Sequence, residues 1–457
     1  MEVEAVRLSI RKLRKTPGMK RGSVASVETF RIKTQTNMTR ILITATCAFT
    51  CLFSSIYGSD WPQYRGVVGD GVSGESIPAL NWEAKPPKQL WKVPTPLGFS
   101  SLAIADGRVF TIVARGEEGG ERIETCVALD ADTGDELWAV ALGVSDYGHD
   151  GGNAGAPGNR GGDGPRSTPA TDGERVFVYD SHMLLSCFDA ASGNVIWKHD
   201  LLKEFSGRQI KWLNASSPLL AGDAVYVGGG GKGETFLAFR KDSGKLIWKS
   251  GDETITHATP RFTEMDGSRQ VIYFAQSGLV SVNADDGQEL WRTSFPFSVS
   301  SAASPVVDGN SVYCSAGYGV GSKVVRINGN SEPEEVWFKP NRLMNHWSTP
   351  IVRDGHLYGI YDFKKYGRAP LQCVEIATGE IKWSERGFGP GNCILVGDKL
   401  VVLSDAGEVV IVSAEPDKFT ELARVKAVTG KCWSTPAFSN GRIYVRSSEE
   451  AACLVVE

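Results

Sequence analysis

Apolar and polar residues alternate with a period of two along much of the chain, in short stretches separated by turns. Residues 168–200 show the pattern well, because four runs rich in Val, Phe, Tyr and Ile are joined by short polar segments. Asp172-Gly173 and Ser192-Gly193 are turn dipeptides, since Gly accepts the positive φ that tight turns require. β-Branched and aromatic residues suit a pleated, half-buried surface. The stretch therefore predicts a four-stranded antiparallel meander.

The meander recurs along the chain with two markers. The first is a turn whose Gly lies four residues before a Trp, and five copies end in this way, at Trp138, Trp197, Trp248, Trp291 and Trp383. Trp337 ends a degenerate copy that lacks the turn. The second marker is a Ser/Thr-Pro opening or its variant, found near residues 100, 168, 217, 259, 304, 349, 392 and 435. Four strands in a period of about 45 residues are typical of a β-propeller.

The eight openings predict an all-β protein, an eight-bladed β-propeller of four-stranded antiparallel blades. The last copy reaches Val456 without a fourth strand, whereas the strand at about 90–93 has no copy before it. We expect this N-terminal strand to pair with the C-terminal blade and close the ring, which hides sheet edges. The tryptophans of the outer strands are expected to dock on the Gly turn of the next blade, as structural residues: Trp91, Trp138, Trp197, Trp248, Trp291, Trp337 and Trp383.

Composition divides the chain into four segments. Residues 1–37 are basic and lack a hydrophobic face, which indicates a disordered arm or a start assigned too early. Residues 38–58 join a short charged end to an apolar run, as in a secretory signal peptide, with a retained membrane anchor as the alternative. Residues 59–89 are expected to form an N-terminal extension across the propeller. Residues 90–457 form the predicted propeller.

Charge and cysteine usage limit the partners and the compartment. Residues 1–40 hold ten Lys and Arg against three Asp and Glu, and the remainder carries a net charge of −11, which argues against nucleic acid as a partner. We expect export to the periplasm, the cell surface or the outside, with no stable membrane span after signal cleavage. Cys187, Cys373 and Cys453 share one repeat position that elsewhere holds Ala or Ser, so we interpret them as small core residues rather than a disulfide framework.

Strand parity predicts which face of the propeller carries function. With strands A to D numbered outward from the axis, the tight A–B and C–D turns share one face. The long segments 145–165, 228–234, 316–322 and 361–370 all fall on the opposite face, in B–C loops and D–A connections. Loops on a rigid scaffold usually carry binding. The residues just before the inner strands should ring the channel mouth on that face: Arg166, Asn214, His257, His346, Trp347, Asn392, Lys431 and Trp433.

These residues allow both functional and structural interpretations. The two histidines suit general bases or ligands, or hydrogen-bonded structural roles. Arg166 suits a bidentate carboxylate contact, or it ties down the 145–165 insertion. Trp347 and Trp433 suit stacking on a flat ligand, or blade packing. No metal site is predicted, because the insertion does not match a calcium loop, and no catalytic set of residues stands out.

The pattern A-x-D-x-x-T-G-x-x-x-W, carried by residues 128–138, resembles the tryptophan-docking repeat of quinoprotein (pyrroloquinoline quinone, PQQ) β-propellers. The resemblance covers about residues 90–457. Three further motifs are similar to those of exported bacterial PQQ-like repeat proteins labelled alcohol or polyvinyl-alcohol dehydrogenase-like: Trp61-Pro-x-x-Arg65-Gly66, Gly164-Pro-Arg-Ser-Thr-Pro169 and Arg386-Gly-Phe-Gly389.

The resemblance implies two kinds of function. The enzymes of the family use PQQ and calcium, commonly with an adjacent-Cys disulfide and an Asp base, and this chain has no adjacent Cys pair. A non-catalytic branch, the propeller lipoprotein of outer-membrane protein assembly, binds partner peptides. We therefore expect a monomeric binding or scaffold protein that holds a protein or small-molecule ligand on its loop-rich face. The alternative is a PQQ-dependent dehydrogenase that oxidises an alcohol or sugar, with the quinone near Trp433, Trp347 and Arg166.

Overall fold

The computed structural model describes residues 60–116, 121–147, 164–299, 301–329, 332–362 and 367–456. The predictions for residues 1–37 and 38–58 lie outside these ranges, as does most of the 145–165 insertion. Strands dominate the described ranges, and their helix is the four-residue α1 (Leu201–Glu204). No helix in these ranges has the length and apolar character needed to cross a membrane.

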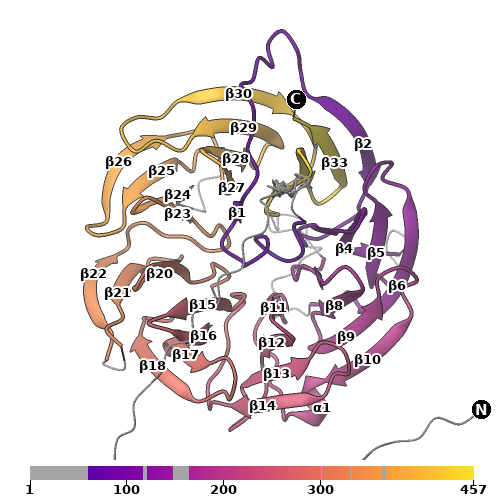
Figure 1. The fold of residues 1–457 in the computed structure, drawn as a ribbon, viewed down its shortest axis with the longest axis vertical. Coiled ribbons are helices and arrows are strands. Elements are labelled where there is room, and N and C mark those ends of the chain that lie inside the picture. The colour runs from indigo at the N-terminus through magenta and orange to yellow at the C-terminus, as the bar shows by residue number, and fades with distance from the viewer. Residues whose placement is uncertain are drawn as a thin grey trace, which may run out of the picture. The chain divides into compact units, whose positions relative to one another are not determined.

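The strands form eight sheets arranged as the blades of a ring (Figure 1). Blade 1 holds β3 (Ala103–Ala105), β4 (Arg108–Arg115), β5 (Ile123–Asp130) and β6 (Glu136–Val144). Blade 2 holds β7 (Ala170–Thr171), β8 (Arg175–Tyr179), β9 (Leu184–Asp189) and β10 (Val195–Asp200). Blade 3 holds β11 (Leu219–Ala221), β12 (Ala224–Gly228), β13 (Phe236–Arg240) and β14 (Leu246–Ser250). Blade 4 holds β15 (Arg261–Met265), β16 (Ser268–Ala275), β17 (Gly278–Asn283) and β18 (Glu289–Ser294).

The second half of the ring repeats this order. Blade 5 holds β19 (Val306–Asp308), β20 (Ser311–Ala316), β21 (Gly321–Arg326) and β22 (Glu334–Pro340). Blade 6 holds β23 (Ile351–Arg353), β24 (His356–Ile360), β25 (Leu371–Glu375) and β26 (Glu380–Glu385). Blade 7 holds β27 (Asn392–Val396), β28 (Lys399–Leu403), β29 (Glu408–Ser413) and β30 (Glu421–Lys426), with β1 (Val72–Ser73) parallel on its inner edge. Blade 8 holds β31 (Ala437–Ser439), β32 (Arg442–Arg446), β33 (Glu450–Val455) and β2 (Lys88–Pro94). The predicted eight-bladed fold is confirmed.

The ring closes inside blade 8, as the sequence predicted. β2 is the outer strand of this blade and pairs antiparallel with β33, with Lys88 opposite Val455 and Trp91 opposite Cys453. The two ends of the propeller are thus joined by an antiparallel ladder with one irregularity between Gln89 and Trp91, and the closed ring leaves no unpaired blade at either end.

The tryptophans of the outer strands join neighbouring blades. The Nε1 atom of Trp248 donates to the carbonyl oxygen of Ala284 in blade 4 at 2.9 Å, and its ring lies over Gly287. A Cβ atom at Gly287 would lie 2.4 Å from this ring, so only Gly fits there. Indole nitrogens make the same kind of bond to the next blade at Trp91, Trp138, Trp197, Trp337 and Trp383.

Trp291 departs from this arrangement for a local reason. Its Nε1 atom donates to Oε1 of Gln270 within its own blade, at 2.8 Å. The next blade is the degenerate copy, whose sequence lacks the Gly turn that accepts the other indoles. The ring of Trp291 still packs against that blade, in a buried cluster that includes Val312 and Ile327.

The Ser/Thr openings form a belt of hydrogen bonds around the inner ring. The amide of Ser101 donates to Oγ1 of Thr168 at 2.9 Å, and the amide of Thr168 donates to Oγ of Ser217 at 2.9 Å. The same bond links Ser217 to Thr259, Ser304 to Thr349, and Thr435 back to Ser101. These hydroxyls satisfy amides at the start of inner strands, so the repeated Ser/Thr is structural.

Residues 60–77, which we call the strap, run across the inner strands of the ring (Figure 1). Contacts of Glu75 with the A–B turn residues Gly397, Asn440 and Gly441 place the strap at the A–B ends of these strands. Trp61 bridges Ile104 of blade 1, the carbonyl of Pro62 accepts from Thr171 of blade 2, and Gln63 exchanges two hydrogen bonds with Leu220 of blade 3. The strap continues into β1 on blade 7, and Glu75 accepts from the amides of Asn440 and Gly441 of blade 8. It contacts blades on opposite sides of the ring.

Candidate functional site

The mouth of the channel, on the face opposite the strap, carries a row of aromatic rings. Trp433 stacks on Trp347, with ring centroids 4.3 Å apart, and its other neighbour is Phe99 at 4.8 Å. The ring centroids of Trp347 and His346 lie 5.4 Å apart. The His346 ring in turn contacts Tyr318 edge-on, with a centroid distance of 5.1 Å. We call these five residues the aromatic row. Phe99, His346, Trp347 and Trp433 are half-buried and Tyr318 is exposed.

The backbone holds the row in place. The rings come from the connections that precede blades 1, 6 and 8 and from the B–C loop of blade 5. Trp347 donates from Nε1 to the carbonyl of Pro390, before blade 7, at 3.0 Å. Asn392 donates from Nδ2 to the carbonyl of Trp433 at 2.5 Å, and the Nζ atom of Lys431 lies 5.9 Å from the Trp433 ring. The entries of blades 6, 8 and 1 therefore supply stacked rings, and the entry of blade 7 holds two of them in place.

A second group lies at the other side of the mouth. Arg166 donates from Nη1 to the carbonyl of Trp212 at 2.9 Å, and its guanidinium lies over the Tyr147 ring at 4.9 Å. The Trp212 ring meets His257 edge-on at 6.3 Å. Burial, with Arg166 and His346 nearby, lowers the pKa of His257 to about 3, so its imidazole is neutral at pH 7. A neutral buried histidine suits hydrogen bonding more than proton transfer.

A buried pair of acids supports this second group. Tyr147 donates to Oε1 of Glu124 at 2.5 Å, and the amide of Ser181 donates to its Oε2. Asp180 lies nearby and accepts from the amides of His182 and Leu184. Burial raises the pKa of Glu124, and burial beside Glu124 raises the pKa of Asp180 to about 7.

The structure thus separates the predicted mouth residues into two kinds. Trp347, Trp433, His346 and Lys431 meet in or beside the aromatic row. Asn214 hydrogen-bonds to the backbone: its Nδ2 donates to the carbonyls of Tyr179, Asp180 and Ser216. Asn392 and Arg166 also bind carbonyls. Within the described ranges, no three His, Cys, Asp or Glu side chains converge in a way that suits a metal ion.

Sequence reasoning missed Phe99, Tyr318 and Trp212. A signal for Phe99 was present, because it lies two residues before the Ser101 opening, as Trp347 lies before Thr349 and Trp433 before Thr435. Aligning on the openings would have placed all three rings in one layer. Tyr318 and Trp212 occupy irregular loops, where the repeat gives no register; both have positive φ, at 57° and 68°.

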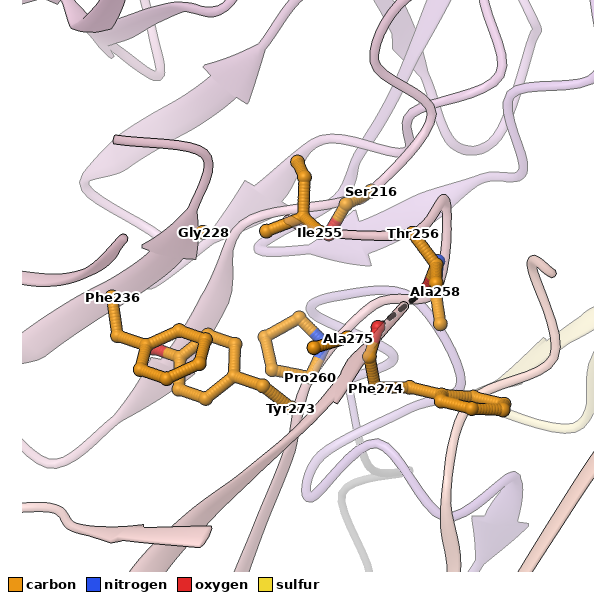
Figure 2. A pocket seen from close by; sticks show the side chains of 10 residues that line it. All are labelled: Ser216, Gly228, Phe236, Ile255, Thr256, Ala258, Pro260, Tyr273, Phe274 and Ala275. Atoms are coloured by element: carbon orange, nitrogen blue, oxygen red, sulfur yellow. Dashed lines mark hydrogen bonds between the residues drawn. The ribbon is translucent and has the colours of Figure 1, made fainter. Parts of the chain in front are cut away.

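A small cavity between blades 3 and 4 does not compete with the mouth as a site. Its lining includes Phe236, Tyr273 and Ile255, and the first two rings are stacked at 4.2 Å (Figure 2). Its volume is about 10 Å³, room for about one water molecule. We therefore interpret it as a packing gap between sheets.

Comparison with known proteins agrees with this architecture. A family model described as "Outer membrane protein assembly factor BamB" matches residues 122–385, more than half of the chain. The chain belongs to this family of PQQ-like propellers. Members with similar sequences include the outer membrane protein assembly factors BamB of Shewanella oneidensis, 22% identical over 260 residues, and of Yersinia pestis, 23% identical over 296 residues. The matches cover 53% and 62% of this chain, and 62% and 71% of those proteins, respectively.

Solved structures of this family and of quinoprotein enzymes share the fold. BamB from Moraxella catarrhalis superposes with a TM-score of 0.55 at 14% identity, over 80% of this chain and 97% of that one. Quinohemoprotein alcohol dehydrogenase from Comamonas testosteroni superposes with a TM-score of 0.59 at 13% identity, over 87% and 80%. At such low identity both likenesses show the fold alone.

The mouth residues of this family member do not fit a stacked quinone. Trp433, the natural platform for a flat cofactor, has Trp347 and Phe99 against it within 4.8 Å. The guanidinium of Arg166, which could hold a carboxylate of the quinone, already contacts a carbonyl and an aromatic ring. The seven described cysteines are buried, free thiols, and none is adjacent to another.

Proposed function

We propose that this chain is an exported, non-catalytic binding protein that holds a segment of a partner protein on the aromatic row, in the assembly of outer membrane proteins. The observation that carries the proposal is the stack of Trp347, Trp433 and Phe99 across several blade entries. Rigid, half-buried aromatic side chains supply large contact areas at a low entropy cost and dominate protein interfaces. The proposed process, outer membrane protein assembly, comes from the names of the relatives. The proposed binding surface, the aromatic row, comes from the geometry.

The chemistry of the row favours a protein segment over a small substrate. The rings lie on three blade entries and one B–C loop and are held by backbone contacts, so they form a broad, preorganised surface. Lys431 beside Trp433 adds a positive charge. Such a surface suits an extended segment with apolar side chains and polar backbone, which buries area along the row without a deep pocket.

Photocrosslinking in the native cell tests the proposal. A benzophenone amino acid replaces Trp433, and crosslinked partners are identified by mass spectrometry. The control carries the same probe at Leu137, an exposed residue of the outer strand β6. We expect crosslinks to proteins of outer membrane assembly from position 433, several-fold fewer after Trp347→Ala, and none from position 137. Equal crosslinking from both positions, or none from position 433, contradicts the proposal.

A PQQ titration tests the alternative function. Trp fluorescence and melting temperature of the full chain are followed as PQQ is added, with and without calcium. The proposal expects no saturable response. Saturable quenching with a raised melting temperature, followed by dye-linked oxidation of an alcohol or sugar, would replace it with the PQQ-dependent dehydrogenase.

A further inference from the structure

The strap inserts a buried arginine into the channel. Arg65, from the Trp61-Pro-x-x-Arg65-Gly66 motif, is 2% exposed and donates to the carbonyls of Thr349 and Pro350 on blade 6, at 2.8 and 2.9 Å. It also donates to the carbonyl of Asp70 in the strap. Its backbone has φ of 63°, and a Cβ atom at Gly66 would lie 3.0 Å from the Trp61 ring. The motif therefore shapes the strap so that this guanidinium enters the ring.

A second buried arginine lies beneath the strap. Arg261, the first residue of inner strand β15, is 8% exposed. Its Nε and Nη1 atoms have no hydrogen-bond acceptor among the described residues, and neither does Nε of Arg65. Its Nη2 atom lies 3.9 Å from Oδ2 of Asp70, too far for a hydrogen bond, while Oδ1 of Asp70 accepts from the amide of Val72.

The charges of this region do not balance. Among the described residues, these two buried guanidinium groups share one carboxylate, that of Asp70, which is itself partly exposed, so one positive charge is left over. Buried charges in proteins are paired, because removing a guanidinium from water without an acceptor is costly. Both guanidinium groups reach the same residue, since Arg65 donates to the Asp70 carbonyl at 2.8 Å and Nη2 of Arg261 lies 3.9 Å from Asp70 Oδ2, so the two cations are close enough to repel. Burial lowers the pKa of both arginines, and Arg65 lowers that of Arg261 further. An anion is the group that relieves this repulsion.

We propose that the channel beneath the strap binds a small inorganic anion of about the size of chloride, held by Arg261 and Arg65. The strap covers Arg261 closely, since a Cβ atom at Gly69 would be in van der Waals contact with Nη1 of Arg261 at 3.7 Å and with Leu219 at 4.0 Å, which favours a small anion. The anion joins the strap, through Arg65, to the inner strand of blade 4, through Arg261, and so locks the strap in the ring.

Melting temperature tests the site. The full chain is heated at constant ionic strength while potassium gluconate is replaced stepwise by potassium chloride. We expect a saturable rise in the wild type, because a ligand that binds only the folded state stabilises it, and no rise in Arg261→Gln. The control Arg353→Gln, also on an inner strand but partly exposed beside Asp354, should keep the rise. An equal rise in Arg261→Gln, or none in the wild type, overturns the proposal.

Two further measurements do not depend on a variant that folds. Crystals of the wild type soaked in bromide should show an anomalous peak between the two guanidinium groups; its absence overturns the proposal. Trypsin cleavage after Arg65, which requires the strap to leave the ring, should slow by about tenfold when chloride replaces gluconate. An unchanged cleavage rate overturns the locking role.

Discussion

The Nη1 atom of Arg446 donates a 2.7 Å hydrogen bond to the carbonyl oxygen of Ser100, across 346 residues of sequence. The same guanidinium, fully buried at the end of β32, also binds Thr111 and the carbonyls of Ile112 and Leu97. It therefore ties blade 8 to blade 1 beside the closing strand. Arg446→Met leaves these acceptors buried without a donor and should lower the free energy of unfolding by about 3–5 kcal/mol.

Urea unfolding measures this loss against a neighbour. Arg442 begins the same strand, is partly exposed and pairs with Asp132 at 2.6 Å. Arg442→Met should cost less than about 1 kcal/mol, as exposed ion pairs do. Similar losses in the two variants would show that Arg446 is not a closure residue.

The contact between Trp248 and Gly287 predicts a coupled pair of substitutions. Gly287→Ala forces a residue with φ of 74° to carry a Cβ atom against the Trp248 ring. Gly355 has a similar φ of 71° with open space around it, so Gly355→Ala should cost only the backbone strain, about 1–2 kcal/mol. Gly287→Ala should cost about 1–3 kcal/mol more because of the clash.

A double-mutant cycle, measured by chemical unfolding, separates the backbone strain from the steric clash with the Trp248 ring. In a Trp248→Ala background the clash is gone, so the cost of Gly287→Ala should fall to that of Gly355→Ala. A cost that does not change with residue 248 would mean that the ring does not select Gly at the turn.

The buried Asp180 predicts a pH dependence of stability. Its pKa is about 7 in the folded protein and about 3.9 in an unfolded chain. Between these values the folded state holds more protons, so the free energy of unfolding falls as pH rises from about 4 to about 7. Asp180→Asn removes this fall. Between pH 4 and 7, the free energy of unfolding of the variant should therefore rise by about 2–4 kcal/mol relative to that of the wild type.

Denaturation curves at several pH values check the sign. Asp189 is the matched control, because hydrogen bonds from Ser192 lower its pKa. Its contribution is present above its unfolded pKa of about 3.9 and is lost as pH falls below that value, so Asp189→Asn should lose stability relative to the wild type as pH rises towards about 4 and should run parallel to it from about 5 to 7. The same slope in both variants would contradict the assignment.

The buried cysteines predict slow thiol chemistry. The seven described cysteines are free and buried, and burial raises, for example, the pKa of Cys373 to about 11 and that of Cys187 to about 12. In a Cys47→Ser/Cys51→Ser background, Ellman's reagent should titrate no thiol in the native state and all seven in guanidinium chloride. A thiol that reacts within seconds in the native protein would indicate an exposed or activated cysteine.

The repeat made most of the fold predictable. The Gly-to-Trp spacing and the Ser/Thr openings gave the blade number, and the orphan strand of Trp91 gave the closure. The partner of Trp291 was not predictable, because the neighbouring degenerate blade has no Gly turn and the indole turns to Gln270 instead.

The mouth was predictable only in part. Strand parity indicated the face, since each residue before an inner strand must lie there. The stacking of Trp347 on Trp433 depends on how far each connection reaches across blade 7, and a repeat carries no such information. The burial of Arg261 next to Arg65 depends on the path of the strap, which lies outside the repeat.

The split of blade 8 between the two ends of the chain has a consequence for synthesis. β2 begins at Lys88 and its partner β33 at Glu450, so a nascent chain cannot complete the ring before β33 has been made. Until β33 emerges, the outer strand of the last blade has nothing to pair with, and long-range closure of this kind is slow. A ring that closes only when β2 meets β33 stays open until both strands exist, so the circular fold is completed in one long-range step.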